Sequence, residues 1–152
     1  MLYQILSDKD FSELMQLHAR EVMEYLFQNG YEFSVLVQTA EVKFDPVLPQ
    51  EIARNFKQVI LFVLTGYTYQ SCKMDEENLY FEAGFGAENF GSNVTVPLYA
   101  IMQILVDDNP IFINLSYPPV KEEKEEDKGL EKSMKVFISN PENEKLLKKK
   151  KK

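Results

Sequence analysis

Cysteine, histidine and tryptophan are nearly absent from this chain of 152 residues, which holds one Cys, one His and no Trp. The single Cys72 permits no internal disulfide bond, which excludes a disulfide-stabilised scaffold and fits a reducing compartment. The single His18 excludes a multi-histidine metal site, and its place at the edge of an apolar helical stripe favours packing or an interface over catalysis. No Walker loop, dinucleotide-binding glycine pattern or metal-type Cys/His spacing is present. We therefore expect no metal, no cofactor and no enzymatic activity.

Long apolar runs are also lacking. The longest, Val59 to Leu64, is far shorter than the roughly 20 residues that span a bilayer. The first ten residues contain Asp8 and Asp10 and no apolar stretch of signal-peptide length. The sequence therefore predicts a cytoplasmic protein with no membrane among its partners.

Basic residues are scarce in the first part of the chain. Residues 1–117 carry 16 acidic and 6 basic side chains, a net charge of −10, whereas residues 118–152 carry 8 acidic and 11 basic ones, a net charge of +3. Nucleic-acid affinity comes mostly from Lys and Arg on a basic face. We therefore do not expect nucleic acid as a partner of the first part. The same shift divides the chain into a folded domain, 1–117, and a flexible charged tail, 118–152.

The folded domain combines one long helix with several short strands. A pattern like a capping box at Ser7 and Asp10 precedes apolar residues at helical spacing, and Asn29-Gly30 supplies a stop, which predicts a helix of about 20 residues. Apolar runs predict strands at 33–39, 59–64, 79–85, 94–96 and 111–115. Pro97 at the head of an apolar run predicts a short second helix over 97–105, and polar residues 66–75 predict a loop. The fold class expected from these elements is α+β.

The tail contains one apolar island. Ten of the twelve residues from Lys121 to Lys132 are charged, too many for a core of their own. Beyond them stand Met134, Lys135, Val136, Phe137 and Ile138, and the chain ends in five consecutive lysines. An apolar island in such a tail indicates a short docking motif, although packing against the domain and no role at all stay open.

Several segments resemble one protein family in their order and spacing. The segment LYFEAGFGAENFGSNVTVPLYAIMQI, residues 79–104, resembles stringent starvation protein B (SspB), whose pattern there is an aromatic, any residue, Ala-Arg-Phe-x-Gly, a turn, an alternating strand, and Pro before a small apolar helix. Upstream, VMEYLFQNGYEFSVLVQ resembles the family's first helix and strand, and LPQEIARNFKQVILFVL its connection and second strand. IFINL is similar to its closing strand. The resemblance covers about residues 14–116.

The resemblance implies both a fold and a function. SspB proteins are cytoplasmic bacterial adaptors that bind ssrA-tagged polypeptides and deliver them to the ClpX unfoldase of the ClpXP protease. Their fold, carried over, is a first helix plus small antiparallel sheets in an Sm-like half barrel, with a flexible tail. An extended tag peptide would lie beside the strand at 79–85, its backbone satisfied by hydrogen bonds.

Residue roles follow from the same resemblance. The peptide-binding residues it implies are Phe81, Ala83, Gly84, Phe85, Ile60 and Phe62. Two copies are expected to pair as a homodimer through the helix stripe of Leu14, Leu17, His18, Val22, Tyr25 and Leu26. Residues 134–138 are the candidate ClpX-docking motif, with Leu146-Leu147 and the terminal lysines as the competing candidate.

Gly84 departs from the family pattern, which has Arg between the Ala and the Phe. The change removes a donor for acidic or polar tag side chains, so we expect a bound peptide that is less acidic and carries a Lys. The alternative function is an Sm-like RNA-binding or assembly module, because a half barrel alone does not specify function. An enzyme with an unrecognised site is the third and least favoured interpretation.

Overall fold

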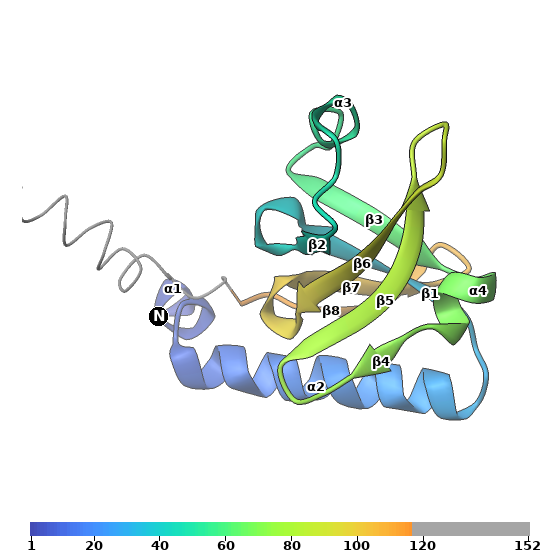
Figure 1. The fold of residues 1–152 in the computed structure, drawn as a ribbon. Coiled ribbons are helices and arrows are strands. Elements are labelled where there is room, and N and C mark those ends of the chain that lie inside the picture. Colours follow the sequence, from blue (N-terminus) through green and yellow to red (C-terminus); the bar gives the residue numbers. More distant parts are fainter. Residues whose placement is uncertain (117–152) are drawn as a thin grey trace, which may run out of the picture. The chain divides into compact units, whose positions relative to one another are not determined.

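The computed structural model describes residues 1–116 and has an α+β fold, as predicted. A long helix lies along two four-stranded antiparallel sheets, which do not close into a barrel within the described residues (Figure 1). The helices are α1 (Leu2–Leu6), α2 (Lys9–Gln28), α3 (Gln50–Ala53) and α4 (Gly66–Gln70), with 3₁₀ turns η1 (Thr39–Glu41) and η2 (Leu98–Ala100). The strands are β1 (Phe33–Gln38), β2 (Lys43–Asp45), β3 (Val59–Leu64), β4 (Lys73–Met74), β5 (Asn78–Phe85), β6 (Phe90–Pro97), β7 (Ile101–Val106) and β8 (Asn109–Ile113).

The predicted N-terminal helix is confirmed as α2. Asp8 stands at its N-cap in an extended conformation, and Asp10 in the first turn suits the positive end of the helix dipole. At the other end Gly30 has φ of +71°, the left-handed conformation that ends a helix. One stripe of α2 is buried, centred on Ala19 and Met23, and it packs against η2 and β7. This burial fixes the helix to the sheets.

Sheet A has the strand order β3-β1-β7-β8. β1 occupies a central position, so it pairs with β3 on one side and with β7 on the other. Its side chains alternate between buried and half-buried, with Phe33, Val35 and Val37 directed into the core. The strand predicted at 33–39 is therefore confirmed, and its side chains alternate with a period of two.

The helix predicted over 97–105 is wrong. Only Leu98–Ala100 forms a single 3₁₀ turn, and Ile101–Val106 is the strand β7, paired on both sides. A short apolar run does not by itself distinguish a buried strand from a buried helix. Here β-branched Ile101, Ile104 and Val106 favour the strand, and pairing with β1 supplies its hydrogen bonds.

Sheet B has the strand order β2-β6-β5-β4. β5 and β6 form its long central hairpin, paired from Asn78↔Pro97 to Phe85↔Phe90. β4 is much shorter and pairs only with Leu79 and Tyr80 of β5. The loop predicted over 66–75 is therefore partly wrong, because α4 and β4 occupy most of it.

A row of aromatic rings joins the two sheets. The ring centroids of Phe62 on β3 and Phe81 on β5 are 5.2 Å apart, and those of Phe62 and Phe85 are 6.4 Å apart. Phe85 continues to Phe44 on β2 at 5.5 Å and to Phe56 at 6.1 Å. Most of these pairs meet edge to face, the arrangement that aromatic quadrupoles favour. The core therefore sits between β3 and β5, directly beneath the segment in which the sequence placed the peptide.

Candidate functional site

Half of β5 has a free edge. β4 ends its pairing at Tyr80, and the next outward backbone group, the N–H of Glu82, donates to the hydroxyl of Ser71 at 2.9 Å. In an antiparallel pair, alternate residues direct their N–H and C=O groups to the same side. The N–H and C=O of Gly84 therefore point to the side that β4 leaves open, and they have no backbone partner there among residues 1–116.

A hollow of about 500 Å³ opens beside this edge. Its volume lies within the roughly 300–1,000 Å³ typical of ligand pockets. It extends from the residue after β2, across β6 and β5, to α4. The lining residues are Pro46, Tyr67, Thr68, Glu82, Ala83, Gly84, Asn89, Gly91, Ser92 and Asn93.

Two glycines lie side by side in the lining of the hollow. Gly84 on β5 stands directly opposite Gly91 on β6, on the face of sheet B that points away from the core. A Cβ atom at Gly84 would overlap the side-chain amide of Asn89, whereas a Cβ at Gly91 would meet nothing within 4 Å. A ligand can therefore approach the backbone closely at Gly91, whereas the Asn89 side chain covers Gly84.

The charged group of the hollow is a carboxylate. The hydroxyl of Tyr67 donates to Oε1 of Glu82 at 2.6 Å, which joins α4 to β5 across the mouth of the hollow. This hydrogen bond, and then the charge of Glu82, raise the pKa of Tyr67. Asp45 on β2 and Glu82 face the same side, because Asn93 of β6 pairs with both. The site is therefore suited to an uncharged or basic ligand rather than to an acidic one.

The structure separates the six predicted peptide-binding residues into three groups. Ala83 and Gly84 line the hollow. Phe62 and Phe81 are only 5% and 2% exposed, so the prediction that they contact the peptide directly is wrong. Phe81 packs in the core because it lies on the inward face of β5, and Phe62 of β3 packs against it. Ile60 and Phe85 are half-buried at the edge of that core.

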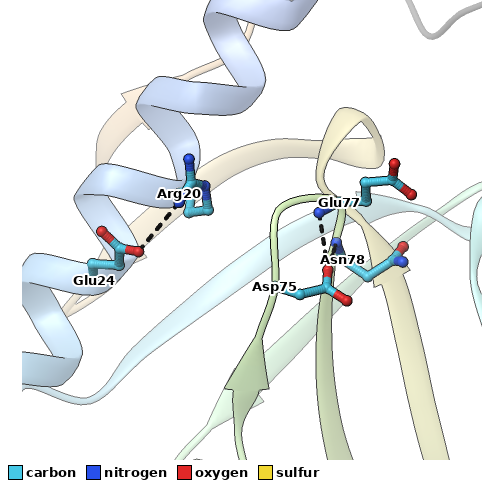
Figure 2. Close-up of polar contacts among 5 residues, drawn as sticks. All are labelled: Arg20, Glu24, Asp75, Glu77 and Asn78. Atoms are coloured by element: carbon cyan, nitrogen blue, oxygen red, sulfur yellow. Dashed lines mark hydrogen bonds and ion pairs between the residues drawn. The ribbon is translucent and has the colours of Figure 1, made fainter.

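The turn between β4 and β5 is held by one carboxylate. Asp75 Oδ1 accepts hydrogen bonds from the N–H groups of Glu77 and Asn78 at 2.9 and 2.8 Å (Figure 2). Its Oδ2 accepts one from the Tyr80 hydroxyl at 2.6 Å. The Tyr80 hydrogen bond and the two backbone ones lower the pKa of Asp75. This turn sets where β5 begins, and so where its free edge lies.

The predicted dimer stripe lies on α2, but not all of it is accessible. Leu14, Leu17, His18 and Tyr25 are exposed and Val22 is half-buried. Leu26 is only 3% exposed within the core, so its assignment to an interface is wrong. Part of the stripe surrounds a shallow hollow with Phe112 of β8. On a neighbouring face of α2, Arg20 and Glu24 form an ion pair at 3.5 Å (Figure 2).

Several residues of the hollow were missed by the sequence analysis. Tyr67 and Thr68 were assigned to a loop, and no role in the site was predicted for Asn89, Gly91 or Ser92. The one feature of the sequence that could have indicated the site is the pair Gly84 and Gly91. The two residues are recognised as neighbours only when the register of the β5–β6 hairpin is known. Tyr67 carried no signal, because its contact with Glu82 spans a separation of 15 residues.

Neither a metal cluster nor a membrane-crossing helix is found in residues 1–116. No three of their His, Cys, Asp and Glu side chains gather as metal ligands would, and none of the helices there has the length and apolar character needed to cross a bilayer. The candidate ClpX-docking residues 134–138, and Leu146-Leu147, lie outside the described residues.

Comparisons with known proteins add no relative. The chain matches no protein-family model, and no curated protein matches its sequence.

Proposed function

We propose that this protein is a non-enzymatic adaptor that binds an extended peptide along the free edge of β5. The observation that carries the proposal is the unpaired backbone of Gly84 beside the hollow. An incoming strand gains affinity from hydrogen bonds to such an edge, and specificity from the pockets that receive alternate side chains.

The open backbone at Gly91 favours a peptide over a small rigid ligand. Gly91 leaves the outer surface of β6 without a side chain, so an extended main chain can lie close to it there, next to the Asn89 amide that covers Gly84. Glu82, held by Tyr67, would meet a basic side chain of that peptide. Both features agree with the expectation that the recognised tag carries a Lys.

The resemblance to SspB supplies the biological setting of the proposal. The peptide would be an ssrA-like degradation tag on a cytoplasmic substrate, and the tail would connect the loaded domain to ClpX of ClpXP. A second copy of the chain would make the connection bivalent, which raises avidity by about a hundredfold or more when both tails reach one hexamer. The adaptor itself would make or break no bond.

The test is fluorescence anisotropy of a labelled ssrA-like peptide with the full chain and two variants. Gly91→Arg fills the hollow from a position where a Cβ meets open space, so the fold tolerates it. We expect its affinity to fall at least about tenfold, equivalent to about 1.4 kcal/mol. Ala87→Arg is the matched control, because Ala87 is exposed in the hairpin turn and does not line the hollow.

Equal affinities of both variants and the unchanged protein would refute the site. An absence of peptide binding by the unchanged chain, together with retarded mobility of labelled RNA, would refute the function and favour the Sm-like alternative.

A further inference from the structure

The hairpin that joins β5 to β6 holds Asn89 in a conformation that few residues adopt. Its φ is +53°, in the left-handed region that Asn enters more readily than most other residues with a side chain. The N–H of Asn89 donates to the C=O of Gly86 at 3.0 Å, and Gly86 has φ of +78°. The backbone of the turn therefore fixes the direction in which the side chain of Asn89 leaves it.

The side-chain amide of Asn89 lies over Gly84 of β5. A Cβ atom at Gly84 would overlap Oδ1 and Cγ of Asn89 and would stand 3.1 Å from its Nδ2. The amide therefore occupies the space that a side chain of residue 84 takes in an ordinary strand. Gly84 itself brings no hydrogen-bonding side chain to this face of β5, and Asn89 supplies one in its place.

The amide of Asn89 is open to a ligand. Asn89 lines the hollow beside Gly84, and its side chain makes no hydrogen bond to the part of the chain that the structure describes. The hydroxyls of Tyr67 and Ser92, in the same hollow, already donate to other groups of the protein. A carboxamide has two N–H donors and an oxygen that accepts two hydrogen bonds. Asn89 can therefore bind a ligand without breaking a hydrogen bond within residues 1–116.

A strand added at the free edge of β5 would bring one of its side chains to this amide. Gly84 directs its N–H and C=O to the open edge, so the peptide residue opposite it can form a hydrogen-bonded pair with it. Residues directly opposite each other on neighbouring strands project from the same face of the sheet, about 5 Å apart. Because Asn89 occupies the side-chain position of Gly84, the peptide side chain opposite Gly84 meets the Asn89 amide.

We propose that Asn89 is a specificity-determining residue of the peptide site, which selects an uncharged side chain with its own amide opposite Gly84. This inference rests on the proposed peptide-binding function and names the class of side chain that the site reads. An amide of the peptide donates to Oδ1 and accepts from Nδ2 of Asn89, so both groups are paired. An aliphatic side chain leaves both of them unpaired, and a carboxylate offers no donor and is repelled by Glu82 in the same hollow.

The test is fluorescence anisotropy of labelled ssrA-like peptides in which each position in turn carries Asn, Ala or Asp. With the unchanged full chain, we expect one position at which the Asn peptide binds about fivefold more tightly than the Ala and Asp peptides, as for one net hydrogen bond of ordinary strength. In Asn89→Gly this preference for Asn over Ala should be lost, whereas the affinity for the Ala peptide should not change. Glycine adopts a positive φ freely, so the turn keeps its conformation.

Two further variants separate the amide from its surroundings. Gly84→Ala retains Asn89 but places a methyl group where its amide lies, so it should displace the amide and abolish the same preference. Asn93→Ala is the matched control, because Asn93 carries the same amide and lines the same hollow, yet it pairs with Glu82 and not with Gly84. It should keep the preference. If Asn89→Gly does not fold, as judged by circular dichroism, Gly84→Ala decides.

The outcomes distinguish this inference from the proposed function. Peptide binding with no preference for Asn at any position overturns the inference and leaves the peptide site in place. A preference that survives Asn89→Gly, or Gly84→Ala where that variant decides, also overturns it, as does one that is lost only in Asn93→Ala. Equal binding by Gly91→Arg and the unchanged chain refutes the site itself, and the role of Asn89 with it.

Discussion

The only thiol of the chain is protected chemically as well as sterically. Cys72 is half-buried against the core, its Sγ lies 3.4 Å from the C=O of Thr68, and burial raises the pKa of its thiol to about 12. Because the thiolate is the reactive form, alkylation by iodoacetamide at mildly alkaline pH should be much slower than for an exposed cysteine. Denaturant should restore the ordinary rate. A native rate equal to the denatured one would contradict this placement.

The same pKa shift predicts how stability depends on pH. The unfolded thiol loses its proton near pH 9, whereas the folded one keeps it up to about pH 12. Between these values the unfolded state binds fewer protons, so the free energy of unfolding falls as pH rises. Cys72→Ser should remove this part of the alkaline decline. The measurement is urea unfolding at several pH values from 8 to 10.

Glu82 should determine the charge preference of the hollow. Glu82→Gln keeps the size of the side chain and removes its charge, so we expect weaker binding of a Lys-containing peptide and a smaller loss of affinity on adding salt. The effect for a group this exposed is on the order of 1 kcal/mol or less. Glu88→Gln is the matched control, because Glu88 is exposed in the hairpin turn outside the hollow. If the two variants bound alike, Glu82 would not contact the peptide.

The long helix is held to the sheets by a narrow stripe. Met23 is fully buried against the core, whereas Leu14 on the same helix is exposed. Met23→Ala should lower the free energy of unfolding by about 2–5 kcal/mol, because it removes buried apolar volume and leaves a cavity. Leu14→Ala, the control, should change it by less than about 1 kcal/mol. Denaturant unfolding followed by circular dichroism measures both, and equal losses would contradict this orientation of α2.

The elements that the sequence predicted well are those with a strong periodicity. α2 has its helical spacing and a stop at Asn29-Gly30, and β1 and β5 alternate with a period of two. The wrong prediction of a helix where the structure has β7 has a physical cause. An apolar run such as Ile101–Leu105 can be buried as a helix or as a strand, and the choice depends on the vacant edge of β1, which local sequence does not encode.

The sequence predicted which strand carries the candidate site, but not the residues that other segments contribute to it. Ala83 and Gly84 were expected at the peptide and do line the hollow. The burial of Phe81 follows from the alternation of β5, yet the sequence alone does not reveal which of its two faces points inward. Tyr67 and Pro46 reach the hollow from segments distant in the chain, through tertiary packing. The free edge at Gly84 likewise depends on β4 being only two residues long.

The chain as a whole joins an acidic domain to a tail of opposite charge. Residues Met1–Pro118 form one compact unit, and the hollow, the free edge of β5 and the stripe of α2 all lie within it. Folding, peptide binding and self-association should therefore be separable from delivery to a protease.

Removing residues 119–152 tests this separation. We expect the shortened chain to unfold at the same urea concentration as the full chain and to bind the labelled peptide with the same affinity, because every lining residue of the hollow is retained. Degradation of a tagged substrate by ClpXP should lose its stimulation, since the domain then has no tether.

Replacing Met134, Val136 and Ile138 by Asp in the full chain should have the same effect if the apolar island is the docking motif. Stimulation that survives these three changes but not the deletion would move docking to Leu146-Leu147 and the terminal lysines. Stimulation that survives the deletion would place the protease contact on the domain itself.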